Sequence, residues 1–208
     1  MIDSLGHTRR FLSAVSSAVS GLSVEALDRL AGELAAVRAA GGRLFVVGSG
    51  GSAANASHAV GDFRKMCALE SYAPSDNVAE LTARTNDDGW SSAYADWLEV
   101  SRINERDGLL VLSVGGGDPT SGLSLNLVSA VDRARAAGAR VFGVVGRRDG
   151  YVVRHAAVCV VVGTDGEFLT PVAESLQSVV CHLLATHPAL LRNSPVWESY
   201  LSVVAAAA

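Results

Sequence analysis

The sequence predicts an α/β protein in which a parallel sheet is covered by helices on both faces. Short, continuous apolar runs alternate with longer segments whose apolar residues recur at helical spacing. Strands of a parallel sheet are buried on both sides, and continuous apolar runs are typical of them. Two of the runs end in glycine-rich turns that lead toward helices, as in open α/β sheets. We predict one domain over residues 1–208, which is an ordinary domain length.

The N-terminal segment, from about residue 5 to 40, is predicted to be helical. Ser23 stands where a helix N-cap is expected, and Gly41 with Gly42 provides a helix stop. Four strands and four further helices follow. The strands are expected over 43–49, 107–113, 140–146 and 156–163, and the helices over 52–67, 91–103, 124–139 and 170–191. The polar stretch LTARTNDDGW, residues 81–90, is predicted to be a loop.

Composition and charge exclude several classes of protein. Hydrophobic residues make up 49% of the chain and charged residues 18%, which is typical of a globular protein. The net charge is −4 without a basic block, so we expect no nucleic-acid partner. We find no signal peptide and no membrane-spanning run. The three cysteines are far apart and lie in apolar surroundings, as is typical of buried thiols in a reducing cytoplasm.

The two glycine-rich turns are candidate anion sites. They are GSGGS (48–52) and SVGGGDPTSG (113–122), and each follows an apolar strand. A turn rich in Gly and Ser offers free N–H groups and hydroxyls, and phosphate is the natural guest. Two alternatives stay open here: tight turns without a ligand, and a dinucleotide site, since GSGGSA fits G-x-G-x-x-G/A loosely. The acidic residue that a dinucleotide site requires about 20 residues later, at the end of a second strand, is not evident.

Four further side chains form a candidate metal or acid–base site. His58 and Asp62 are four residues apart and share one helix face, and Glu174 and His182, eight apart, share another. Two imidazoles and two carboxylates suit a divalent metal such as zinc, and they also suit proton transfer. Each histidine alone is more often a core or surface residue, and Glu174 also fits as a charge in the first turn of a helix.

These residues, in this order, resemble the sugar isomerase (SIS) domain family, and within it the phosphoheptose isomerases. The resemblance runs from about Leu27 to Leu190. It rests on GSGGS, on His58 and Asp62 after it, on the Asn-Asp pair in TNDDGW, on the loop SVGGGD, and on Glu174 and His182 in the last helix. The combination is specific, although no single piece is.

The resemblance implies a flavodoxin-like three-layer α-β-α sandwich that forms homotetramers with sites at subunit interfaces. It implies an isomerase that interconverts sedoheptulose 7-phosphate and a heptose 7-phosphate aldose, with Asp62 and His182 as proton carriers. It also implies a divalent metal, which is zinc in many members of the family, held by His58, Asp62, Glu174 and His182. The implied substrate-binding residues are Ser49, Gly50, Gly51, Ser52, Asn86, Asp87, Ser113, Val114, Gly115, Gly116, Asp118 and Glu174.

The chain departs from the family pattern at its site. Asp62 stands where Glu is usual, Glu174 where Gln is usual, and Ser49 where Asn is usual. The loop SVGGGD has lost hydroxyls from the family's S-T-S-G-N-S pattern, and each would donate a hydrogen bond worth about 1 kcal/mol to a phosphate oxygen. Thr120 and Ser121 are possible replacements.

The leading hypothesis is therefore a cytoplasmic phosphosugar aldose–ketose isomerase of a divergent subgroup. One alternative is a sensor that binds a sugar phosphate without chemistry. The others are an isomerase of another phosphosugar, and a lyase or etherase on the same fold.

Overall fold

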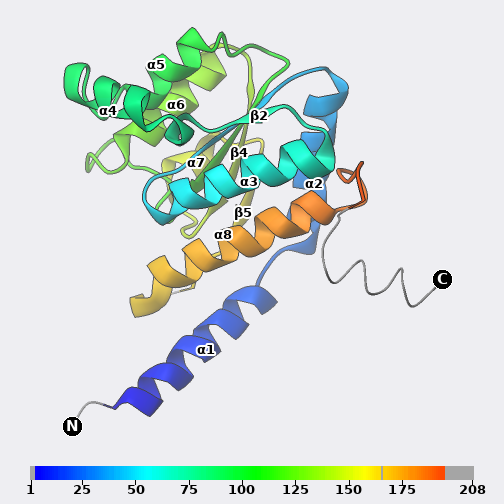
Figure 1. Cartoon of the computed structure of the whole chain (residues 1–208). Helices are drawn as coiled ribbons and strands as arrows, with labels where there is room; N and C mark the ends of the chain where they lie inside the picture. Colours follow the sequence, from blue (N-terminus) through cyan, green and yellow to red (C-terminus); the bar gives the residue numbers. More distant parts are fainter. Residues whose placement is uncertain (1–2, 165, 195–208) are drawn as a thin grey trace, which may run out of the picture.

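The computed structural model describes residues 3–164 and 166–194, and its centre is one five-stranded parallel sheet (Figure 1). The strand order is β2-β1-β3-β4-β5, and every neighbouring pair is parallel. This is the flavodoxin-like order, so the predicted fold class is confirmed. The strands are β1 (Leu44–Val47), β2 (Ser71–Tyr72), β3 (Gly108–Ser113), β4 (Arg140–Val145) and β5 (Val158–Val161).

Helices cover both faces of this sheet. The buried residues of α2, α3 and α8 belong to one hydrophobic cluster, and those of α5, α6 and α7 belong to a second cluster on the other face. The helices are α1 (Ser4–Ser20), α2 (Val24–Ala39), α3 (Gly51–Cys67), α4 (Val78–Asp87), α5 (Ala93–Val100), α6 (Leu125–Ala136), α7 (Tyr151–His155) and α8 (Leu169–Thr186). Two short 3-10 turns, Pro74–Asp76 and Gly166–Phe168, complete the described elements.

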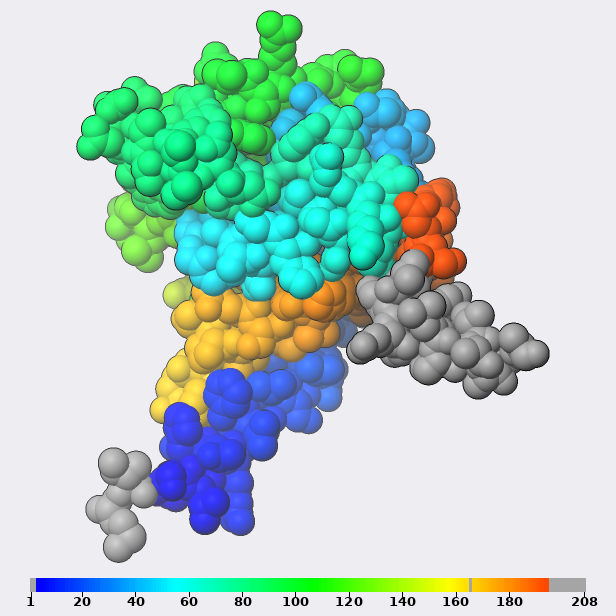
Figure 2. Space-filling view, in the orientation of Figure 1, coloured from blue at the N-terminus to red at the C-terminus, as the bar shows by residue number. Residues whose placement is uncertain are grey.

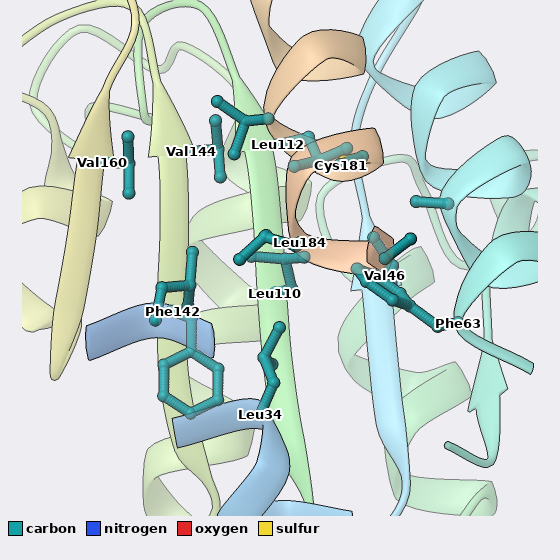
Figure 3. Packing of buried hydrophobic residues seen from close by; sticks show 14 of the residues in the cluster. Leu34, Val46, Phe63, Leu110, Leu112, Phe142, Val144, Val160, Cys181 and Leu184 are labelled. Carbon is teal, nitrogen blue, oxygen red and sulfur yellow. The ribbon is translucent and has the colours of Figure 1, made fainter. Parts of the chain in front are cut away.

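The central strand β3 shows how the sheet separates the two clusters. Leu110 and Leu112 point into the cluster beneath α2, α3 and α8, whereas Leu109 and Val111 point into the other. Successive side chains of a strand alternate between faces, so a continuous apolar run fills both cores at once. Figure 3 shows the first cluster, in which Phe63 approaches the sheet from the helical layer.

Helix α8 is apolar because it is a core helix of this fold. The stretch Gly166–Thr186 is long and apolar enough to cross a membrane by length and composition, but half of its most apolar window is buried inside the fold. Leu176, Val180 and Leu184 lie on its inner face at helical spacing and are almost fully buried. The apolar character of α8 is thus explained by packing against the sheet.

One segment differs from its prediction. Most of the stretch predicted as a loop over 81–90 lies in helix α4, which begins at Val78. The Asn77 side chain caps this helix by accepting a hydrogen bond from the Glu80 amide, and Glu80 pairs with Arg84 one turn later. No residue of α4 is buried. Val78 and Leu81 are its only large apolar residues, so the segment is polar enough overall to resemble a loop in the sequence.

The other differences are small and have local causes. Strand β2 is only two residues long and pairs with β1 alone, so it gives no sequence signal. The predicted N-terminal helix is interrupted at 21–23, where Gly21 ends α1 and Ser23 begins α2. Ser23 is the predicted N-cap, and its side chain accepts a hydrogen bond from the Ala26 amide at 3.1 Å.

The strand order places a ligand site at the carboxyl ends of β1 and β3. The chain turns toward β2 after β1 and toward β4 after β3, so the direction of winding reverses between these neighbours. In open α/β sheets this reversal opens a crevice at the carboxyl edge, where ligands bind. Both glycine-rich turns begin there, directly after Val47 and Ser113.

Candidate functional site

The first glycine turn joins β1 to α3 in a conformation that requires glycine. Gly50 has φ 60° and ψ −129°, a region that side chains disfavour. Gly48 lies so close to the Ser52 backbone that a Cβ at Gly48 would approach the Ser52 carbonyl to 2.5 Å. The turn therefore folds tightly, and α3 begins at once at the carboxyl edge of the sheet.

Two buried side chains from the opposite face hold this turn in place. The hydroxyl of Tyr94, on α5, donates to the Gly48 carbonyl at 2.7 Å. The amide of Asn126, on α6, donates to the Ser49 hydroxyl at 3.0 Å. Tyr94 is 1% exposed and Asn126 is fully buried. Both are rigid supports, because a buried polar group is restrained by its hydrogen-bond partner.

The second glycine turn follows β3 and is folded by its own serine and by α7. The Ser113 hydroxyl accepts a hydrogen bond from the Gly116 amide at 3.0 Å. Gly116 and Gly117 have φ of 75° and 77°, and their carbonyls accept hydrogen bonds from the amides of Val152 and Tyr151. Both carbonyls thus point toward α7, so their partly negative oxygens do not face a ligand bound at the turn.

The carboxylate of Asp118 is occupied within its own loop. It accepts hydrogen bonds from the Thr120 amide at 2.9 Å and from the Ser121 hydroxyl at 2.7 Å. Both bonds lower the pKa of Asp118, and the bond from Ser121 has the larger effect. The Ser121 hydroxyl, which the sequence offered as a replacement phosphate donor, is thereby engaged by Asp118.

The helices α3 and α8 bring together three of the four predicted metal and acid–base residues. The Nε2 atoms of His58 and His182 lie 3.1 Å apart, and both approach the Oδ2 atom of Asp62, at 3.3 and 3.6 Å. The two helices lie side by side and run in the same direction, and Figure 2 shows both on one open face. The side chains of His58 and His182 are about half exposed, and Asp62 is more covered.

Glu174 lies apart from this group. Its carboxylate lies against Gly51 at the start of α3, where a Cβ would contact it at 2.6 Å. Eight residues of helix separate Glu174 from His182, which is about 12 Å of axial rise. Glu174 is therefore placed beside the first glycine turn, while the two histidines and Asp62 converge further along the same helix pair.

Asn86 and Asp87 are placed at the exposed end of α4. The Asn86 amide donates to the Asp87 carboxylate at 2.8 Å. Within the ranges 3–164 and 166–194 neither side chain has another hydrogen-bond partner, and neither contacts the glycine turns through hydrogen bonds. The sequence alone could not place these two side chains, because the segment that carries them was predicted to be a loop.

The comparisons with known proteins identify the family. A model of the SIS domain matches residues 9–146, which is more than half of the chain. The chain belongs to the SIS domain family. A phosphoheptose isomerase of Streptomyces coelicolor is 34% identical over 173 residues, which cover 79% of this chain and 67% of that protein. One from Desulfovibrio desulfuricans is 31% identical, over 81% of this chain and 79% of its own length.

A solved structure supports the same fold. The structure of a phosphoheptose isomerase from Francisella tularensis superposes with a TM-score of 0.75 at 22% identity, over 88% of this chain and 97% of that one. The family predicted from the sequence is thus confirmed.

In this SIS domain, the donor set of His58, Asp62 and His182 fits a divalent metal. Zinc held tetrahedrally, with bonds of about 2.0–2.1 Å, places its ligand atoms about 3.3 Å from one another. The three separations here are 3.1, 3.3 and 3.6 Å, and two of the three donor atoms are imidazole nitrogens. Three protein ligands with an exposed side are typical of a catalytic rather than a structural zinc site.

Sequence reasoning missed two residues that shape this site. Tyr94 and Asn126 fix the first turn. Neither carries a sequence signal, since their partners are backbone and side-chain oxygens far away in the sequence.

Proposed function

We propose that this SIS domain is an isomerase that interconverts sedoheptulose 7-phosphate and D-glycero-D-manno-heptose 7-phosphate. The observation that supports this best is the convergence of His58, Asp62 and His182 from the neighbouring helices α3 and α8. A protein that only bound a sugar phosphate would not need an imidazole and a carboxylate within reach of each other. The similarity to phosphoheptose isomerases gives the substrate class.

The reaction moves one hydrogen between adjacent carbons. A base removes a proton from C1 of the ketose and the C2 oxygen gains a proton, which gives the enediol. A proton then returns at C2 while the hydroxyl proton on the C1 oxygen leaves, which gives the aldose. Asp62 and His182 are the proposed proton carriers, because an ionised carboxylate and an imidazole can each accept and return a proton near neutral pH. Their reactive atoms lie 3.6 Å apart, which is close enough to serve two neighbouring carbons.

His58, Asp62 and His182 would also hold a divalent metal, which we propose to be zinc. When bound, such an ion polarises the substrate carbonyl and lowers the cost of the negative charge on the enediol. Asp62 and His182 are then shared between metal binding and proton transfer. Glu174, beside Gly51, would contact the sugar from the first glycine turn, and a closer approach on ligand binding would add it to the three metal-binding groups.

The remaining substrate contacts are proposed from the two turns and from α4. Ser49, Gly50, Gly51 and Ser52 would contact the sugar from the first turn, and Asn86 with Asp87 would bind its hydroxyls. From the second turn the phosphate contacts would come from Ser113, Val114, Gly115 and Gly116. Asp118 would border them with its carboxylate bound within its own loop, because an inward-pointing carboxylate would repel phosphate.

We further propose that the chain acts in the cytoplasm as a homotetramer with sites at subunit interfaces. The half-exposed His58 and His182 support this, because proton transfer at carbon benefits from a site closed to water. Exposed apolar side chains also lie on α8 itself and on α1, which packs against it. They are Val179 and Leu183 on α8, and Leu5 and Leu12 on α1.

The test is a proton NMR assay of sedoheptulose 7-phosphate in heavy water, with and without zinc. The native protein is expected to give aldose signals with deuterium at C2, and His182→Ala is expected to give none. His155→Ala, outside the cluster, is the matched control. If native protein neither forms product nor exchanges hydrogen, the isomerase is excluded. Stabilisation by the sugar phosphate without turnover would instead support a sensor.

A further inference from the structure

A polar link joins helices α3 and α8 in the interior of the protein. The side-chain amide of Asn55, on α3, donates to the Glu174 carbonyl at 2.8 Å and to the Gln177 side-chain oxygen at 3.2 Å, both on α8. Gln177 is fully buried and Asn55 is partly buried. The Glu174 carbonyl can only accept a hydrogen bond, so Asn55 must present its nitrogen to α8, and Gln177 must then present its oxygen.

This link lies between two parts of the site. On α3, Asn55 precedes His58 by three residues, which is about 4.5 Å of helical rise. On α8, Gln177 follows Glu174 by three residues and precedes His182 by five. The link is therefore placed between the first glycine turn, where the Glu174 carboxylate lies, and the pair of histidines.

Few other directional contacts fix how far α8 is displaced along α3. Several of the buried residues that the two helices contribute to their common apolar cluster are small, among them Ala56, Ala59 and Ala173. Apolar packing is non-directional, so small side chains alone specify an axial position weakly. In the described part of the chain, the other side-chain links from α3 to α8 are those of the proposed metal-binding cluster and a weak hydrogen bond from the Cys67 thiol to the Ala185 carbonyl at 3.4 Å.

The same link lowers the stability of the fold. The Nε2 atom of Gln177 is buried and has no hydrogen-bond partner among the described residues. A buried donor without an acceptor is unfavourable, and an apolar side chain of the same shape would avoid that cost. Stability alone would therefore favour an apolar residue at position 177, so the glutamine is better explained by the alignment that its oxygen provides.

We propose that Asn55 and Gln177 are positioning residues that set the register of α3 on α8 and thereby bring His182 to His58 and Asp62. The inference rests on the proposed function for zinc binding and isomerisation, but not for the placement of the two imidazoles. Metal–ligand distances are satisfied only within about 0.2 Å, whereas one residue of helix is about 1.5 Å of rise. A slide of α8 by a fraction of one residue would therefore disperse the three donor atoms.

Gln177→Met tests the role of the link, because methionine has a similar length and no amide. The dissociation constant for zinc of the chelator-treated protein is expected to rise 10–100-fold, and kcat is expected to fall at least tenfold. The KM should change less than threefold, because Tyr94 and Asn126 hold the first turn independently. The midpoint of urea unfolding should stay equal or rise, because the unpartnered amide is gone.

Leu176→Met is the matched control, since it places methionine at the adjacent buried residue of α8 without removing a polar group. It should keep the native zinc affinity and kcat. A native zinc affinity in Gln177→Met would overturn the proposal, and so would an equal loss in Leu176→Met. A lower unfolding midpoint in Gln177→Met with native kcat would show a purely structural role.

The partner variant tests whether the two residues act as one link. Asn55→Ala should weaken zinc binding as much as Gln177→Met does, and the double variant should bind zinc no more weakly than either single variant. Fully additive losses in the double variant would contradict a shared role.

The positioning role and the proposed function can fail separately. If the native protein turns over no sedoheptulose 7-phosphate, calorimetric titration with zinc still compares it with Gln177→Met. If it binds no zinc either, the imidazole NMR signals of the metal-free protein remain as a readout. Those of His58 and His182 are expected to shift in Gln177→Met while that of His155, on α7, stays in place. Unshifted signals would overturn the positioning role, and native turnover in Gln177→Met would leave the isomerase standing without it.

Discussion

Asn126 donates its side-chain amide to the hydroxyl of Ser49 across 3.0 Å, and this bond joins the two halves of the ligand crevice. Ser49 belongs to the turn after β1, and Asn126 belongs to the helix that follows the turn after β3. The bond therefore spans the point where the winding of the sheet reverses. The Oδ1 atom of Asn126 is buried and has no partner among the described residues.

Replacing Asn126 by alanine is expected to loosen the first turn. A buried hydrogen bond of this kind contributes about 1 kcal/mol, so the KM should rise about fivefold and the free energy of unfolding should fall by roughly 1–3 kcal/mol. Steady-state kinetics and urea unfolding measure the two effects. Ser49→Ala in the Asn126→Ala background should add little, because the bond is already lost. Fully additive losses would show that the two residues act independently.

For the value of kcat, we expect the charge of the side chain at position 62 to matter more than its length. Asp62→Asn removes the proton acceptor and should lower kcat by about 10²–10⁴-fold. Asp62→Glu restores the residue usual in the family and should keep at least a tenth of the native kcat. The comparison is made by steady-state assay at saturating zinc. Equal losses in both variants would argue that Asp62 only supports the packing of α3 against α8.

The affinity for zinc should distinguish His58, which is proposed only as a metal ligand, from Asp62 and His182, which are also the proposed proton carriers. His58→Ala is expected to weaken zinc binding to the metal-free protein by more than about a hundredfold, since even partners outside the ligand shell contribute 10–100-fold. Calorimetric titration of the chelator-treated protein measures this affinity. His7→Ala, on α1, is the control and should bind zinc as the native protein does. A native affinity in His58→Ala would exclude this residue as a ligand.

Asp107 should be a strong stability site away from the ligand crevice. It is 1% exposed, and Arg43 contacts both of its oxygens, at 2.7 and 3.2 Å, at the amino ends of β1 and β3. Removing one partner of a buried ion pair leaves the other charge uncompensated, so Asp107→Ala should cost about 3–5 kcal/mol. Urea unfolding gives this cost. The KM of the folded variant should stay native, and a changed KM would link this edge to the site.

Alkaline pH should destabilise the protein through Cys181. Burial raises the pKa of this thiol from 9.0 to about 12. In the unfolded chain the thiol ionises above pH 9, while in the folded protein it stays protonated. The stabilisation is therefore complete below pH 9 and is lost as the pH rises toward 12, at up to about 1.4 kcal/mol per unit.

Unfolding of native protein and of Cys181→Ala at pH 8, 9 and 10 tests this. The variant should lose less stability per pH unit, although burial also raises the pKa of Cys67 and Cys159 and keeps part of the slope in both proteins. Parallel slopes would contradict the contribution of Cys181.

Four of the five strands, the family and the chemical types at the site could be predicted from the sequence alone. Apolar runs such as 44–47 and 108–113 are readable because strands buried on both faces are apolar throughout. The pairing of His58 with Asp62 is equally readable, because residues four apart on a helix are neighbours. These signals come from residues that are close together in the sequence, so they can be recognised without a structure.

How the separate segments meet could be learned only from the tertiary structure. The parallel packing of α3 on α8 brings His182 to His58 and leaves Glu174 beside Gly51, and no spacing within one helix contains that information. Likewise, α7 meets the second glycine turn through the amides of Tyr151 and Val152, which donate to the carbonyls of Gly117 and Gly116. Contacts between distant segments depend on the register of whole elements, which is set by the burial of both apolar cores together.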